Sequence, residues 1–414
     1  MDNQSNNHHS EIEGNKDMSI KYRSEANYVD EDVEKNNMEE EEKNNLILHA
    51  HSKDNMSVKS HGGVTHKSSF LIQGFGRDIS IHCLLKLSRS DYGSIAALNK
   101  SFRSLIKTGE LYKLRGKMDI LEHWVYFSFE VRQWEAFDPN RNRWMDLPKI
   151  NSEKLQVFGS LAVGTELLVF GTELMDLIIY KYSLLTNTWS VGKMLHTPRR
   201  MFGYASLGEI GIIAGGVDEG GKTLSSAELY NSNTGKWETL PKMNTARKMC
   251  SSVFMDGKFY VMGGIGAYHK TYLTCGEEFD MKTKEWRVID NMFPIQNAMF
   301  GAPIIFSSFH SYAVVKNVLY AADYAQQKIK KFDKDNHSWV TIGIFPNHDT
   351  PMDVWGLSFH SCGDRLLFFG GCNINGKDMI EISYWIVDEG APHWKLLTRK
   401  KSWNFIHNCA VMGC

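Results

Sequence analysis

The sequence predicts an all-β fold, a six-bladed β-propeller over residues 119–414, and three repeated features support this prediction. Tryptophan recurs six times at intervals of 45 to 55 residues. Another aromatic residue stands seven positions before each of the first five tryptophans, and apolar stretches that end in glycine precede most of these aromatics. Self-similarity at a near-constant period is typical of repeat folds. The six tryptophans are Trp144, Trp189, Trp237, Trp286, Trp339 and Trp394.

Each repeat is expected to hold four short strands in about fifty residues. The aromatic residue ends one strand, a polar turn follows, and the tryptophan begins the next strand, as in a β-hairpin. The sixth unit breaks this register, because Trp385 lies nine residues before Trp394. A single four-stranded sheet leaves its faces uncovered, so the units are expected to pack around an axis, with each indole between neighbouring blades.

Glycine pairs mark strands that are expected to crowd one another near the axis. A side chain at such a position would clash with a neighbouring strand. The fifth unit carries Ala321-Ala322 instead of a pair. The three clear pairs are Gly215-Gly216, Gly263-Gly264 and Gly370-Gly371.

The first unit, residues 124–147, shows only three recognisable strands. The chain ends in an apolar segment, residues 404–414, that resembles the first strand of the other units. We therefore expect this segment to complete the first blade and close the ring. Closure removes two sheet edges that would otherwise favour aggregation.

Residues 1–69 differ from the rest in composition. They contain fourteen Asp and Glu against eight Lys and Arg, with few aromatic residues, which predicts a disordered acidic tail. The whole chain has a net charge of −1, so no global field attracts it to nucleic acid or a membrane. No apolar stretch is long enough to span a bilayer, and the seven cysteines are scattered without a CxxC pair. These features favour a reducing compartment, the cytoplasm or the nucleus.

Three short helices are predicted in residues 70–115, because apolar residues recur there at helical spacing between capping residues. Three helices of this length make a small core, so the module is expected to bury apolar surface against a partner protein. The alternative is that the same residues only join the helices to the first blade. The residues expected to contact the partner are Ile79, Leu84, Leu85, Leu87, Ile95, Leu98, Phe102 and Leu105.

The glycine pair, the aromatic residue and the tryptophan at these spacings resemble the kelch repeat. Residues 70–115 resemble an F-box in segments such as Cys83-Leu84-Leu85 and Ser101-Phe102-Arg103. The combination is similar to the plant F-box/kelch-repeat family and covers nearly all of residues 70–414. One departure is that F-boxes usually begin with Leu-Pro, whereas this chain has Leu71-Ile72 and lacks the rigid proline.

The resemblance implies a substrate-recognition subunit of an SCF-type ubiquitin ligase. Its F-box would dock a Skp-family adaptor and, through it, cullin and RING subunits, while its propeller would hold a target protein. Such a subunit catalyses nothing itself and supplies proximity. Two alternatives stay open: an adaptor-independent interaction scaffold, favoured by the missing Leu-Pro, and a propeller enzyme that acts on cytosolic metabolites.

Signals of catalysis are weak in this sequence. The histidines are dispersed, no His/Cys spacing matches a zinc site, and there is no Gly-x-Ser-x-Gly elbow. The glycine pairs do not open helices, so they do not resemble phosphate loops. We therefore expect no catalytic residue, no metal and no cofactor.

Arg199 and Arg247 are the residues predicted to contact the target. Each stands ten residues after a repeat tryptophan and is expected to offer its guanidinium group to an acidic or phosphorylated peptide. The alternative is that they bond to loop carbonyls between blades. Further candidate contacts are the loops over residues 218–223, 266–272 and 293–310.

Overall fold

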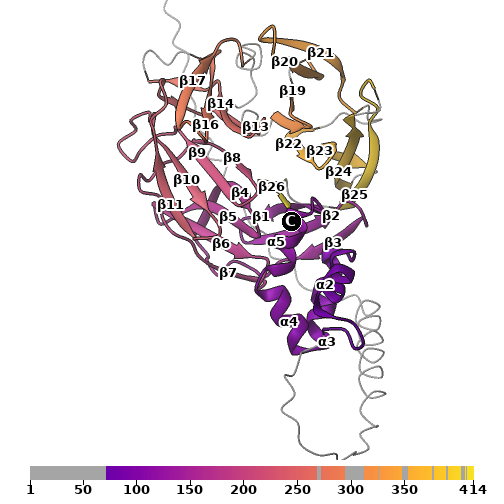
Figure 1. The fold of residues 1–414 in the computed structure, drawn as a ribbon. Helices are drawn as coiled ribbons and strands as arrows, with labels where there is room; N and C mark the ends of the chain where they lie inside the picture. The colour runs from indigo at the N-terminus through magenta and orange to yellow at the C-terminus, as the bar shows by residue number, and fades with distance from the viewer. Residues whose placement is uncertain are drawn as a thin grey trace, which may run out of the picture. The chain divides into compact units, whose positions relative to one another are not determined.

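The computed structural model describes residues 71–414 except 268–271, 294–311, 325, 347–352, 375–376, 388–389, 402–405 and 407. The expected acidic tail, residues 1–69, therefore lies outside the described residues. Six four-stranded antiparallel sheets surround a common axis, as Figure 1 shows, and this confirms the predicted six-bladed β-propeller.

Each of the six sheets forms one blade, and the innermost strand is named first here. Blade 1 comprises β26 (Asn408–Gly413), β1 (His123–Glu130), β2 (Gln133–Asp138) and β3 (Arg143–Asp146). Blade 2 comprises β4 (Leu155–Val163), β5 (Glu166–Glu173), β6 (Asp176–Ser183) and β7 (Thr188–Val191). Blade 3 comprises β8 (Gly203–Leu207), β9 (Ile210–Ala214), β10 (Ala227–Asn231) and β11 (Lys236–Leu240).

The remaining blades repeat this order. Blade 4 comprises β13 (Ser251–Met255), β14 (Lys258–Met262), β16 (Gly276–Asp280) and β17 (Glu285–Ile289). Blade 5 comprises β18 (Tyr312–Val315), β19 (Val318–Asp323), β20 (Lys328–Asp333) and β21 (Ser338–Ile344). Blade 6 comprises β22 (Asp353–Cys362), β23 (Arg365–Ile374), β24 (Lys377–Ile386) and β25 (Lys395–Lys401). A two-stranded ribbon joins β12 (Arg247–Lys248) to β15 (Ile265–Gly266).

The innermost strands form a closed ring. Each contacts the innermost strand of the next blade, in the order β26, β4, β8, β13, β18, β22 and back to β26. Strand β26 pairs antiparallel with β1 from His123↔Gly413 to Ser128↔Asn408. The C-terminal strand therefore supplies the fourth strand of blade 1, so that blade joins the two ends of the ring.

The seven-residue spacing of aromatic and tryptophan is a cross-strand pair. In blades 1 to 5 the two residues face each other on adjacent strands, as Tyr230 faces Trp237. Their ring centroids lie 4.6 to 5.4 Å apart. The indole N–H of Trp237 also donates to the carbonyl of Lys193, 2.9 Å away in the segment that follows blade 2. Trp189 and Trp286 make the same contact with a carbonyl that follows the preceding blade, and Trp394 makes it with Ile344 at the end of β21. These indoles therefore connect neighbouring sheets.

The glycine pair of blade 3 fits backbone that leaves no room for a side chain. Gly215 and Gly216 have φ values of 71° and 94°, a region that L-residues with a Cβ rarely adopt. A Cβ on Gly216 would lie 2.5 Å from the carbonyl oxygen of Arg200. Gly263-Gly264 repeats this geometry in blade 4. Gly370-Gly371 differs, because both residues lie within β23 and pair with Glu381 and Ile380 of β24.

Residues 77–117 form four α-helices ahead of the propeller, one more than the sequence predicted for the corresponding segment. The fourth, α5, was missed because Gly109 and Gly116 made the segment a poor helix candidate. It forms because Leu111, Tyr112 and Arg115 are buried. The helices, with the short 3-10 helix η1, are α2 (Arg77–Leu85), η1 (Arg89–Asp91), α3 (Tyr92–Leu98), α4 (Lys100–Lys107) and α5 (Glu110–Lys117). We call these elements the helical module.

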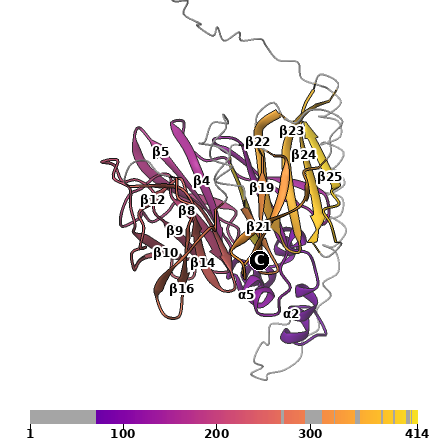
Figure 2. The ribbon, with the colours of Figure 1, turned by 90° about the horizontal axis from the view of Figure 1, so that it is seen from above.

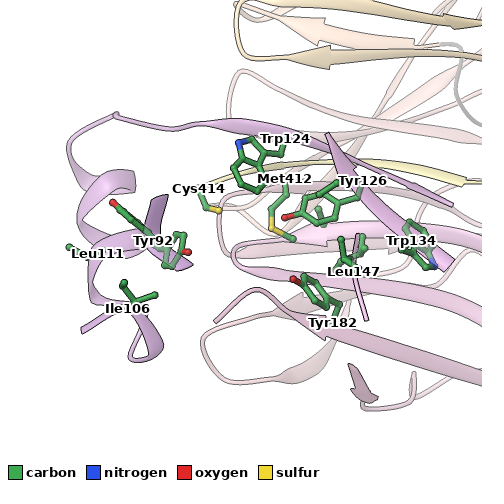
Figure 3. Close-up of a cluster of buried hydrophobic side chains, with 14 of the residues drawn as sticks. Tyr92, Ile106, Leu111, Trp124, Tyr126, Trp134, Leu147, Tyr182, Met412 and Cys414 are labelled. Carbon is green, nitrogen blue, oxygen red and sulfur yellow. The ribbon is translucent and has the colours of Figure 1, made fainter. Parts of the chain in front are cut away.

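The helical module and blade 1 share one hydrophobic core. Tyr92 and Leu111 of the helices belong to the same cluster of buried residues as Trp124 and Cys414, which lie next to each other on the blade in Figure 3. The same cluster continues to Tyr182 of blade 2. The module therefore gains from the propeller the apolar contacts that its own short helices do not supply.

Candidate protein-interaction surfaces

The eight apolar residues predicted to contact an adaptor divide into two groups by exposure. Ile79, Leu87 and Leu98 are 54%, 40% and 72% exposed. The other five are at most 9% exposed and belong to the core shared with the propeller. The buried group holds the module together, and the exposed group is accessible to a partner. The buried residues are Leu84, Leu85, Ile95, Phe102 and Leu105.

The chain in front of α2 is held in place without the proline that F-boxes usually have. Leu71 is buried in the shared core. The N–H of Ile72 donates to Ser80 Oγ at 3.3 Å, and the N–H of Phe75 donates to the carbonyl of Ile72 at 3.1 Å. Phe75 itself is 48% exposed beside α2. Sequence reasoning did not select it because it stands in a turn between Gly74 and Gly76.

A buried polar network fixes the helical module on blade 1. The Arg115 guanidinium donates to the carbonyl of Leu87 at 2.9 Å and to the Glu122 carboxylate at 3.0 Å. Glu122 also accepts from the Ser88 hydroxyl at 2.9 Å. Its backbone exchanges hydrogen bonds of 3.1 and 3.2 Å with Cys414. Because α5, the start of η1 and the residue after β26 all bond to Glu122, the module and the ring form a single rigid junction.

The arginines predicted to contact the target are used inside the blades, so that prediction requires correction. Arg199 and Arg247 are 1% and 0% exposed and pair with the buried Glu228 and Glu277 at 2.7 and 2.9 Å. Each also donates to two or more backbone carbonyls. Burial lowers the pKa of Arg199 below its usual value. The alternative, that these arginines bond to backbone carbonyls, agrees with the contacts. Most of the carbonyls, however, lie within the blade that follows each arginine and not between blades.

The glutamates that complete these pairs escaped the sequence prediction, although a repeated spacing marks them. Glu228 follows Arg199 by 29 residues and Glu277 follows Arg247 by 30. Each stands two residues before the repeat aromatic of its blade. A comparison of corresponding positions between repeats would have found this pairing.

The predicted contact loops are described only in part. In the loop over residues 218–223, Asp218 Oδ1 accepts from the backbone N–H of Lys222 at 2.9 Å, while Glu219 and Lys222 are exposed. Most of residues 266–272 and 293–310 lie outside the described residues.

Comparisons with known proteins agree with this architecture. The model of the Kelch motif matches residues 198–244 and 246–293, within blades 3 and 4 and the segments that flank them. The chain is 50% identical to the F-box/kelch-repeat protein SKIP11 of Arabidopsis thaliana over 85% of this chain and 77% of that protein. Two other F-box/kelch-repeat proteins of the same plant are 47% and 48% identical, over 85% and 81% of this chain and 85% and 77% of their own lengths. This chain belongs to the F-box/kelch-repeat family.

Among the described residues no group of three His, Cys, Asp or Glu side chains could hold a metal ion. A cavity of about 280 Å³ at the junction is lined by His123, Cys362 and Asp364. Burial raises the pKa of the Cys362 thiol to about 12, so the thiol stays protonated and is a poor nucleophile. The fold and the family point to protein interaction rather than to an enzyme. No helix in the described ranges combines the length and apolar character that crossing a membrane requires.

Proposed function

We propose that this chain is the substrate-recognition subunit of an SCF-type E3 ubiquitin ligase. The helical module docks a Skp-family adaptor, which connects it to cullin and RING subunits, and the propeller binds a target protein. Ubiquitin transfer belongs to the other subunits, and this chain contributes proximity. We infer that the subunit acts in the cytoplasm or the nucleus, because its scattered cysteines favour a reducing compartment.

One observation carries the proposal. After the helical module has filled its shared core, Phe75, Ile79, Leu87 and Leu98 are still 40% to 72% exposed on its α2 and α3 side. Full burial of such a side chain contributes about 1.5–3 kcal/mol relative to full exposure. Four such side chains leave apolar area available for a partner, and a module that Arg115 and Glu122 hold in place loses little entropy on binding.

The test is a pull-down of purified Skp-family adaptor by the full chain. The variants Ile79→Asp and Leu98→Asp are expected to lower adaptor affinity about tenfold or more, because each places a charge in an apolar interface. Both positions are exposed, so the melting temperature should stay near that of the wild-type protein. The matched control is Leu207→Asp, a 53% exposed leucine on β8 of the propeller.

The competing function is the adaptor-independent scaffold. It predicts that the wild-type chain does not retain the adaptor, and that the aspartate variants behave like the control. Either result would exclude the ligase subunit as proposed.

A further inference from the structure

The two ends of the blades differ in what they contact. The helical module lies at the end where β2 turns into β3 and β6 into β7. There Arg141 donates to Ser90 Oγ at 2.7 Å, and Leu184 and Leu185 pack against the shared core. Because the strands are antiparallel, the β5–β6 turn and the segments that lead into β8 and β13 lie at the opposite end. Figure 2 shows β12 at the end away from α2 and α5.

The β5–β6 turn has unusual residues for its geometry. Leu174 and Met175 connect the paired residues Glu173 and Asp176 with φ values of 50° and 86°. Two positive φ values are typical of a type I′ turn, which favours Asn-Gly. Bulky apolar residues are strained in this region, and these two are 71% and 80% exposed.

Tight turns that follow the innermost strands place Gly, Asn or Asp at their positive-φ positions, with Lys316 as an exception. Asp256-Gly257 and Lys316-Asn317 both have positive φ at each position. Gly164, Gly208 and Gly363 occupy the single positive-φ position of the corresponding turns in blades 2, 3 and 6. Among these described turns, only the β5–β6 turn, at the end away from the helical module, has two apolar residues at positive φ. The exposed side chains of Leu174 and Met175 contribute nothing to the core.

Neighbouring residues extend the Leu174-Met175 turn into a continuous surface. Arg200 Nη2 donates to the carbonyl of Met175 at 3.1 Å. Met201 follows with a φ of 58° and 42% exposure, and its carbonyl accepts from the N–H of Met249, also at positive φ, at 2.7 Å. Phe158, 37% exposed at a bulge in β4, packs edge-on against Phe202 with ring centroids 6.1 Å apart. We call Phe158, Leu174, Met175, Arg200, Met201 and Met249 the rim patch.

Arg200 is the charged member of the rim patch, Lys248 stands next to Met249, and the acidic Glu173 and Asp176 flank the turn. Arg199 and Arg247 are neutralised by buried glutamates. The adjacent Arg200 and Lys248 have no carboxylate partner among the residues that the structure describes. Thioether and branched apolar side chains adapt to varied apolar partners, and the two cations favour an acidic group beside them.

We propose that the rim patch binds a segment of the target protein in which a bulky apolar side chain lies next to an acidic residue. This inference rests on the proposed function, because it assigns the target to the end of the propeller away from the helical module. Leu174 and Met175 hold their strained conformation to present apolar side chains to that segment, and Arg200 pairs with its carboxylate.

The experiment uses a displayed library of random short peptides selected against the full wild-type chain. Selected peptides are expected to combine Leu, Ile, Met, Phe or Trp with Asp or Glu. The variant L174N/M175G should lower their affinity about tenfold or more. Its melting temperature should be unchanged or higher, because Asn-Gly suits the turn. R200Q should weaken binding and flatten its salt dependence.

The matched control is V288T/V340T, which removes two exposed valines, 45% and 50% exposed, from the outer strands β17 and β21, and it should bind the peptides as the wild type does. Three results overturn the inference: the selection yields no apolar-acidic peptides, L174N/M175G binds them with wild-type affinity, or its melting temperature falls. The adaptor pull-down separates the two hypotheses. If the wild-type chain retains the adaptor and any of these three results is found, only the proposed role of the rim patch is refuted. If the wild-type chain does not retain the adaptor, the proposal of a ligase subunit is refuted.

Discussion

Removing the Glu228 carboxylate should destabilise blade 3 strongly. In Glu228→Ala the buried Arg199 guanidinium loses its ion pair of 2.7 Å, and the backbone N–H groups of His196 and Thr197 lose acceptors at 2.8 and 3.0 Å. Breaking a buried pair from one side costs about 3–5 kcal/mol, since it leaves an uncompensated charge. For a unit of this size such a loss lowers the melting temperature by roughly 5–10 °C.

The assay is thermal and urea unfolding of four proteins: wild type, Glu228→Ala, the double variant Arg199→Leu/Glu228→Leu, and the exposed control Glu238→Ala on the neighbouring strand. The double variant should recover part of the lost stability, because it removes both buried charges. The control should stay within about 0.5 kcal/mol of the wild type. A Glu228→Ala protein as stable as the control would refute the view that Arg199 and Glu228 form a structural pair. It would reopen the question of whether Arg199 contacts a target.

Two further predictions concern closure and pH. Deletion of residues 408–414 removes β26 and its pairing with β1, so the truncated chain should appear mainly in the insoluble fraction, and a soluble monomer of wild-type melting temperature would contradict the role of this strand. Burial alone would raise the pKa of Glu278, but hydrogen bonds from Lys258, Arg287 and Tyr260 lower it below the ordinary value of 4.5. Its contribution to stability is therefore fully present above that value and is lost as the pH falls through the lower, folded-state pKa. Unfolding free energy measured from pH 6 to pH 3 should fall less steeply in Lys258→Met than in the wild type, and equal slopes would exclude this assignment.

The ring was predictable because its signal is both local and repeated. Tyr230 and Trp237 face each other across one hairpin, so turn geometry fixes their spacing. Four of the repeat tryptophans, including Trp237, also donate their indole N–H to a carbonyl of the preceding blade or the segment after it. Tryptophan therefore makes both the cross-strand contact and the contact between blades, and the number of repeated tryptophans gives the number of blades. The exposure of Ile79 against the burial of Leu84 was not predictable in the same way. Both are apolar and close in one helix, and the propeller core decides which of them it covers.

Buried polar pairs were missed for a related reason. Arg199 looks like a surface arginine when the sequence is read along the chain, since it stands in a polar segment between two strands. Its partner Glu228 lies 29 residues away, and only the fold shows that the two meet in the interior. Charged residues are rarely buried unless they are paired, so an arginine with no visible partner was expected to be exposed. The prediction was wrong because the fold supplies a partner from a distant strand.

The closing strand links the two halves of the proposed function. Strand β26 completes blade 1 through its pairs with β1, and the chain continues directly to Cys414, whose backbone bonds to Glu122. Glu122 is also the carboxylate that holds Arg115 of α5 and Ser88 beside η1. The strand that closes the ring therefore also seats the helices, and the helical module cannot tilt against the ring without breaking this junction. An adaptor on α2 and α3 and a peptide on the rim patch would then be held in one fixed relation, which is what a receptor that works by proximity requires.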